Sequence, residues 1–124
     1  MRTALAIGRP DLAERLVDGY QPRYRYAEHA LVAATAALAE AHCHHQAAAD
    51  GYTEAAKRWQ HFGVVPEQAF ALLGRGRCLV ALERPVEAAD SLRRAREVFE
   101  LLGAAPALAE TDALLQQATA VSAY

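Results

Sequence analysis

Two stretches of the chain decide its fold: AADGYTEAAKRWQHFG at residues 48–63 and AADSLRRAREVFELLG at residues 88–103. Their apolar residues recur at steps of four and three, a spacing that keeps one face of an α-helix apolar. The stripe residues are Ala48, Tyr52, Ala55, Trp59 and Phe62 in the first stretch and Ala88, Leu92, Ala95, Phe99 and Leu102 in the second. Both stretches are therefore predicted to be helices, with Trp59 and Phe99 in the core.

The two stretches are related by a shift of about 40 residues, which places Ala48 on Ala88 and Trp59 on Phe99. The glycine and proline that come after each stretch are related by the same shift, because Gly63 falls on Gly103 and Pro66 on Pro106. One helix pair cannot bury its own apolar face, whereas stacked pairs bury a continuous one. The shift therefore predicts a solenoid with one helix pair in each unit.

Proline tends to occupy the first turn of a helix and glycine tends to follow the last, so the sequence marks helix limits from Pro10 onward. The predicted fold is all-α, with about six or seven helices in antiparallel pairs. The helices expected from this punctuation cover residues 10–17, 25–41, 46–62, 66–82, 85–102 and 106–121. We expect one domain over residues 1–124, divided into a partial N-terminal repeat or edge (1–24), two repeats (25–63 and 64–103) and a C-terminal capping helix (104–124).

Composition describes a globular chain and argues against several function classes. Of its 124 residues, 53% are hydrophobic and 23% charged, and the formal net charge is −2. This balance gives no electrostatic attraction to nucleic acid or to an anionic membrane. No apolar run approaches the roughly 20 residues that span a bilayer. Cys43 and Cys78 are too few for a disulfide framework, so we expect a cytoplasmic protein.

The small residues of this pattern resemble the tetratricopeptide repeat. That family places a small residue in helix A, another twelve positions later in helix B, a large apolar residue four further on, and alanine three beyond that. The residues that fit are Ala36, Ala48, Tyr52 and Ala55 in one repeat and Gly76, Ala88, Leu92 and Ala95 in the next. The family period is about 34 residues, so this is a long form. Val32 and Leu72 stand where tryptophan is common. The resemblance implies a short right-handed superhelix that binds proteins on the concave face of its A helices.

Residues 25–117 also resemble the C-terminal helical region of large bacterial signalling proteins. The segments that carry this likeness are YTEAAKRW (52–59), ALLGRGRCL (71–79) and ALAETD (107–112). In such proteins the repeats follow an ATP-binding module of the AAA or STAND type, and some members add a nucleotide-cyclase or LuxR-type DNA-binding domain. The resemblance implies a fragment of a bacterial regulator. The alternative is a short standalone protein.

Residue types that could carry chemistry are present, but their spacing favours structural roles. His42-Cys43-His44-His45 has metal-ligand side chains, yet it matches no standard zinc motif and falls at a predicted turn. Cys78 lies on a predicted helix without an evident activating base, so we expect a buried thiol. Glu110 and Asp112 are two residues apart on a helix and do not face each other. We therefore predict no enzyme activity, no cofactor and no metal site.

The concave face of the A helices is the predicted binding surface for a protein or peptide segment. In the repeat frame it comprises Ala33, Ala37, Glu40, Phe70, Leu73, Arg77, Glu110 and Gln117. Arg77 is the most informative member, because a lone arginine among alanine and leucine needs a partner if it is buried.

These patterns together favour a non-catalytic protein–protein interaction and regulatory scaffold. The alternative is a domain that senses a small-molecule effector in its repeat groove. Exposed apolar residues near the N-terminal edge predict self-association of the chain into a homo-oligomer. They are Leu5, Ile7, Leu12 and Leu16.

Overall fold

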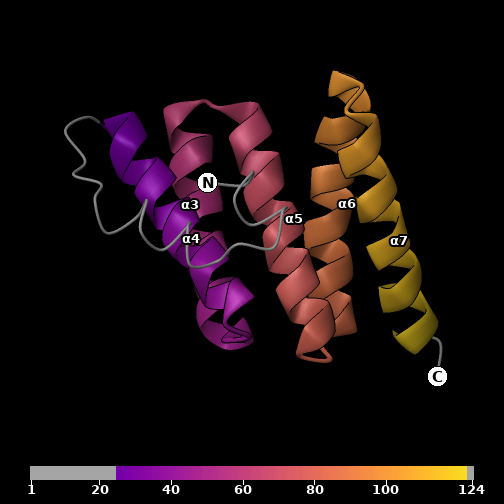
Figure 1. Cartoon of the computed structure of the whole chain (residues 1–124). Coiled ribbons are helices and arrows are strands. Elements are labelled where there is room, and N and C mark those ends of the chain that lie inside the picture. The colour runs from indigo at the N-terminus through magenta and orange to yellow at the C-terminus, as the bar shows by residue number, and fades with distance from the viewer. Residues whose placement is uncertain (1–24, 123–124) are drawn as a thin grey trace.

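The computed structural model describes the backbone of residues 25–122 and the side chains of residues 27–120. This part of the chain forms five α-helices and no strand, so the predicted all-α fold is confirmed. The helices are α3 (Arg25–Ala41), α4 (His45–Phe62), α5 (Val65–Ala81), α6 (Pro85–Leu102) and α7 (Ala105–Ser122). Figure 1 shows them side by side in one stack, with successive helices running in opposite directions.

Each of these helices begins and ends within one residue of its predicted limits. The helix predicted at residues 10–17 lies outside the described residues. The same holds for the N-terminal edge over residues 1–24 and its proposed contact at Leu5, Ile7, Leu12 and Leu16. The count of six or seven helices therefore stays a prediction. Among the described residues, no helix is long and apolar enough to cross a membrane.

Proline, not a side-chain cap, opens the later helices. Val64 and Arg84 occupy the N-cap positions of α5 and α6 without a capping side-chain hydrogen bond. Pro66 and Pro85 stand in the first turns of these helices, where the first N–H groups have no partner inside the helix. The fixed φ of proline suits a helix start, and its missing N–H carries no penalty there.

After four of the helices, one residue adopts the left-handed backbone conformation; it is glycine after two of them and another residue type after the other two. α4 ends at Gly63 (φ 87°) and α6 at Gly103 (φ 66°), where glycine adopts this conformation without a steric penalty. The turns after α3 and α5 instead place Cys43 (φ 61°) and Glu83 (φ 60°) in the same region. These two turns also share one hydrogen-bond pattern: Cys43 N donates to Glu40 O, and Glu83 N donates to Val80 O. The backbone therefore repeats at the spacing seen in the sequence.

The helices are not equivalent in their contacts beyond nearest neighbours. Each packs against the next along the chain, as short connections require. In addition, α3 contacts α5, and α5 contacts α7. Among the described residues, no Cα atoms of α4 and α6 approach within 8 Å. The odd-numbered helices thus form one closely spaced layer, which we call the α3–α5–α7 face.

The core follows the two predicted stripes except at their last members, because Phe62 and Leu102 are 42% and 51% exposed at the ends of α4 and α6. Trp59 and Phe99 are 1% and 0% exposed, which confirms both as core residues. The stripe alanines of α4 and α6 are fully buried and let neighbouring helices approach closely. Phe99 packs edge-on against Phe70 of α5, at 5.1 Å between ring centroids. Such pairs add to the stabilisation from burial itself.

Buried hydroxyl groups within the core have hydrogen-bond partners. Ser91 of α6 donates to the carbonyl of Leu72 on α5 at 2.7 Å, which joins the two helices of a pair. Thr111 donates to the carbonyl of Ala107, one turn earlier in α7, also at 2.7 Å. Neither hydroxyl therefore carries the penalty of an unsatisfied buried polar group.

The two turns that flank α4 generate a paired prediction on stability. Cys43→Gly should raise the free energy of unfolding by about 0.5–1 kcal/mol, because glycine relieves a left-handed cysteine. Gly63→Ala should lower it by about 1 kcal/mol. A Cβ added at Gly63 meets no atom within 4 Å, so the loss would report backbone conformation alone. Urea unfolding measures both, and shifts of the same sign would contradict this account.

Candidate interaction site on the α3–α5–α7 face

Arg77 of α5 binds Glu40 of α3 with two parallel hydrogen bonds. Its Nε donates to Glu40 Oε2 at 2.7 Å, and its Nη2 donates to Glu40 Oε1 at 2.9 Å. The side chains are 34% and 21% exposed, respectively. A two-point arginine–carboxylate pair is among the stronger polar contacts in proteins and fixes the relative orientation of the two groups. It therefore sets how α3 and α5 lie against each other.

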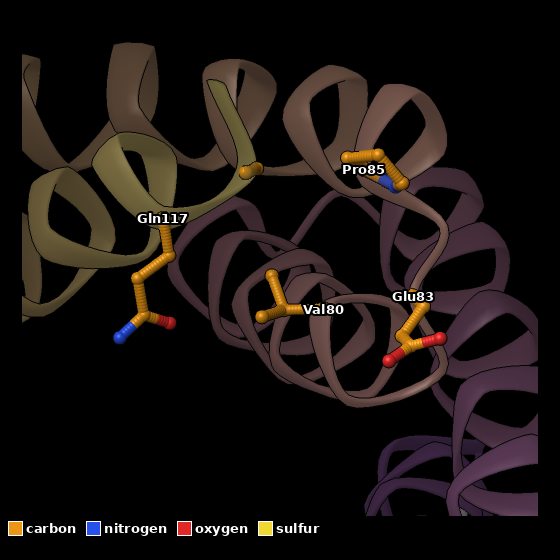
Figure 2. A pocket seen from close by; sticks show the side chains of 5 residues that line it. Val80, Glu83, Pro85 and Gln117 are labelled. Atoms are coloured by element: carbon orange, nitrogen blue, oxygen red, sulfur yellow. The ribbon is translucent and has the colours of Figure 1, made fainter. Parts of the chain in front are cut away.

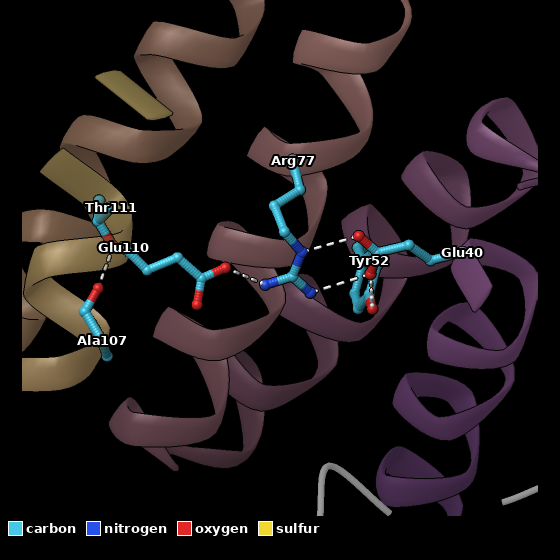
Figure 3. Close-up of polar contacts among 6 residues, drawn as sticks. All are labelled: Glu40, Tyr52, Arg77, Ala107, Glu110 and Thr111. Atoms are coloured by element: carbon cyan, nitrogen blue, oxygen red, sulfur yellow. Dashed lines mark hydrogen bonds and ion pairs between the residues drawn. The ribbon is translucent and has the colours of Figure 1, made fainter. Parts of the chain in front are cut away.

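The same guanidinium also reaches the third helix of the layer. Arg77 Nη1 donates to Glu110 Oε2 of α7 at 2.8 Å. Figure 3 shows Arg77 extended between Glu40 on one side and Glu110 on the other. Glu110 is the most accessible of the three, with its side chain 46% exposed. Arg77 is thus not the lone arginine that the sequence suggested, because two carboxylates from neighbouring A helices compensate it.

Tyr52 supports this network from the layer behind. Its hydroxyl donates to Glu40 Oε1 at 2.7 Å, although the residue belongs to α4 and is only 5% exposed. The ring passes close to Gly74 of α5, where an added Cβ would lie 2.5 Å from Tyr52 Cζ. The absence of a side chain at Gly74 therefore gives the Tyr52 ring the space to reach Glu40.

Burial and charge keep the members of this network in defined protonation states. Burial alone would raise the pKa of Glu40, but hydrogen bonds from Arg77 and its positive charge outweigh this and hold the pKa below its usual value. The pKa of Tyr52 is raised, first by burial and then by the charge of Glu40. Burial would lower the pKa of Arg77, yet its bonds to Glu40 raise it. At neutral pH, Glu40 is therefore an anion and Tyr52 a hydrogen-bond donor.

Cys78 lies next to Arg77 in sequence but belongs to the core. It is fully buried, as the sequence predicted. Burial raises the pKa of the Cys78 thiol to about 12, and the negative charge of Glu40 adds to the increase. Since only the thiolate is a strong nucleophile, Cys78 is unreactive at neutral pH.

The His42–His45 cluster occupies the turn between α3 and α4 and the first residue of α4. Cys43 is exposed, and the rings of His42 and His44 lie 6.2 Å apart between centroids. Within residues 25–122, no three side chains among His, Cys, Asp and Glu converge in a way that could hold a metal ion.

The eight residues predicted for the concave face fall into three groups. Glu40, Arg77 and Glu110 meet in the network. Ala37 and Leu73 are buried, Leu73 with 2% exposure, so they belong to the core and not to an accessible surface. The remaining three are partly buried or exposed and lie away from the network: Ala33, Phe70 and Gln117. Sequence reasoning missed Tyr52, whose stripe position indicated core packing and gave no sign of its hydroxyl contact.

A groove lies where the C-terminal half of α7 passes the turn between α5 and α6. It has a volume of about 470 Å³. Its lining residues are Val80, Glu83, Pro85, Gln117 and Ala118. Figure 2 shows the Gln117 amide and the Glu83 carboxylate at its two edges, with Val80 between them. Gln117 is therefore a groove residue and has no part in the ion-pair network.

Two other arginines, on α4 and α6, pair with acidic residues outside this network. Arg96 of α6 donates to Asp112 of α7 at 2.6 Å and to Glu100 at 2.7 Å. On α4, Arg58 pairs with Glu54 one turn away at 2.9 Å. These exposed pairs contribute little to stability individually.

No protein-family model matches this chain, and the comparisons with curated proteins and with solved structures likewise give no significant match.

Glu40 generates a prediction on pH dependence. Its pKa in the folded protein lies below the ordinary value of 4.5, so its stabilisation is present above that pH and is lost as the pH falls through the folded pKa. Glu40→Gln should lower the free energy of unfolding by about 1–3 kcal/mol at pH 7. The difference from wild type should shrink steadily below pH 4.5.

Urea unfolding between pH 3 and 7 measures this difference. Glu54→Gln is the control, because it removes the carboxylate of an exposed pair and should change stability by less than about 0.5 kcal/mol. A Glu40→Gln deficit that stays constant with pH would show that the charge of Glu40 makes no contribution.

Proposed function

We propose that this chain is a non-catalytic protein–protein interaction and regulatory scaffold module, built as a short tetratricopeptide-like superhelix. Its α3–α5–α7 face receives a peptide or protein segment. The observation that carries this proposal is the network of Glu40, Arg77 and Glu110, which presents a pre-ordered, partly exposed polar centre on three adjacent helices.

The contact pattern of the helices supports a curved stack. α5 lies close to both α3 and α7, whereas no Cα atoms of α4 and α6 approach within 8 Å. When one layer of a stack is closer than the other, the stack bends toward the closer layer. The α3–α5–α7 face then lies on the inside of the curve, which is the side that offers a bound segment the most contact.

The state of the polar network supports recognition. Arg77 is held by three hydrogen bonds, so a partner that contacts it would not have to immobilise a flexible side chain. Glu110 binds through one oxygen to Arg77 and is the more open of the two carboxylates. A carboxylate acceptor beside a fixed guanidinium donor suits the alternating donors and acceptors of a polypeptide.

The protonation states support a role without catalysis. A general acid or base needs a pKa close to the working pH. Glu40 is shifted away from neutrality toward lower pKa, and Arg77 toward higher pKa. Cys78 stays a thiol. These groups therefore bind and orient, and they are not poised to exchange protons at pH 7.

The wider setting of the proposal rests on the sequence resemblance to repeat regions of bacterial AAA- or STAND-type regulators. The low cysteine content favours a cytoplasmic location, and in this proposal the chain contacts other domains of a parent protein or a separate partner. The alternative, an effector-sensing repeat domain, predicts that a small molecule and not a peptide competes for the same face.

A peptide-display selection against the folded domain tests the proposed function. Selected peptides should bind the α3–α5–α7 face, so Glu110→Gln should weaken their binding about tenfold by removing one charge-assisted contact. Isothermal titration calorimetry measures the dissociation constants.

Glu54→Gln provides the matched control for this experiment. Glu54 and Glu110 have similar exposure, 51% and 46%, and each pairs with one arginine, but Glu54 lies on α4. Its substitution should leave peptide affinity unchanged. Equal losses for both variants, or a loss for Glu54→Gln alone, would place the binding surface elsewhere and refute the proposal.

A further inference from the structure

The groove beside Val80 stands where the preceding repeat carries its ion pair. The repeat has a period of 40 residues, so each residue of α3 corresponds to the residue of α5 that is numbered 40 higher. Residues of α5 correspond to residues of α7 in the same way. The same shift carries Glu40 to Val80 and Arg77 to Gln117. Between α3 and α5 this position holds a charged pair in direct contact. Between α5 and α7 the equivalent residues line an open groove.

The groove combines an apolar base with polar edges. Val80, Pro85 and Ala118 contribute apolar atoms. Ala118 is only 2% exposed, so it closes the groove on the side of the core. Glu83 and Gln117 supply a carboxylate and an amide at the edges (Figure 2). A ligand group that matches this arrangement has a long apolar stem and a polar tip.

Glu83 gives the groove its charge. It is exposed and forms no ion pair with the residues that the structure describes. Its φ of 60° matches that of Cys43 at the equivalent turn. Arg84 follows it in sequence but does not line the groove. The negative charge at this edge is therefore available to a partner.

We propose that this groove binds one arginine side chain of a partner protein segment. The methylene stem packs on Val80 and Pro85, and the guanidinium binds the Glu83 carboxylate at one edge of the groove. Arginine fits better than an aliphatic residue, which would leave the charge of Glu83 unused, because its planar donors match a carboxylate. The chain itself pairs an arginine with a carboxylate in this layer, through Arg77 on Glu40, although Glu83 corresponds in the repeat to Cys43 and not to Glu40. The assignment rests on the proposed function and names the partner residue that this part of the face selects.

Titration with a blocked peptide that carries a single arginine between glycines tests the assignment. Nuclear magnetic resonance of the methyl groups of Val80 and Ala118 reports binding at the groove. The arginine peptide should bind about tenfold more tightly than matched peptides with citrulline or leucine, because citrulline keeps the shape of arginine without its charge. Equal responses to arginine and citrulline, or a stronger response to leucine, would overturn the proposal.

Two variants of the protein locate the effect. Glu83→Gln removes the charge at an exposed position and should weaken the arginine peptide about tenfold. Val80→Glu combined with Gln117→Arg should block the peptide by placing the ion pair of the preceding repeat in the groove. Circular dichroism confirms that each variant remains folded. If the double variant unfolds, Glu83→Gln alone decides, and an unchanged affinity for the arginine peptide would overturn the assignment.

The outcome also separates this assignment from the proposed function. If no glycine-flanked peptide shifts the groove methyl groups while display-selected peptides still bind the face, the arginine assignment fails and the scaffold proposal stands. If the display-selected peptides also fail to bind, both fail.

Discussion

Close approach of helices at small residues is the constraint on which the rest of this structure depends. Ala48 and Ala55 of α4, like Ala88 and Ala95 of α6, are fully buried where adjacent helices meet. Larger side chains at these points would separate the helices and leave Trp59 and Phe99 without close neighbours. The spacing of the odd-numbered helices follows from this packing. Only at that spacing can one arginine on α5 reach carboxylates on both α3 and α7.

The fold was predictable because its signals are local. Helix limits followed from proline in the first turn and glycine after the last, and the buried stripe followed from steps of three and four. Cys43 and Glu83 could not be placed in the left-handed region, since neither is a residue type that favours it. Their conformation is imposed by the turn that each helix pair requires and not by the residue itself.

The candidate site was predictable only in part. Glu40, Arg77 and Glu110 were each assigned to one face, but their meeting depends on how three helices distant in sequence are aligned, and periodicity carries no such information. Leu73 was assigned to the same face and is buried instead, because α5 has neighbours on both sides and its accessible strip is narrow. The role of Tyr52 was hidden for a related reason. A stripe position predicts where the ring is buried, while the hydroxyl can continue through the layer to a polar partner.

Because the backbone repeats so closely, the differences between repeats must come from side chains. The turns at Cys43 and Glu83 have nearly the same φ. Beside the first turn, α3 and α5 are joined by an ion pair, whereas beside the second turn, α5 and α7 line a groove. At the first position, the Glu40–Arg77 pair joins α3 to α5 and fixes the orientation of its own charged groups. Valine and glutamine at the second position leave apolar surface and polar edges that only an external group can complete. Within the proposed face, the choice of a particular partner residue therefore depends on the position where one repeat departs from its neighbour, since the residues that match are those that the packing requires.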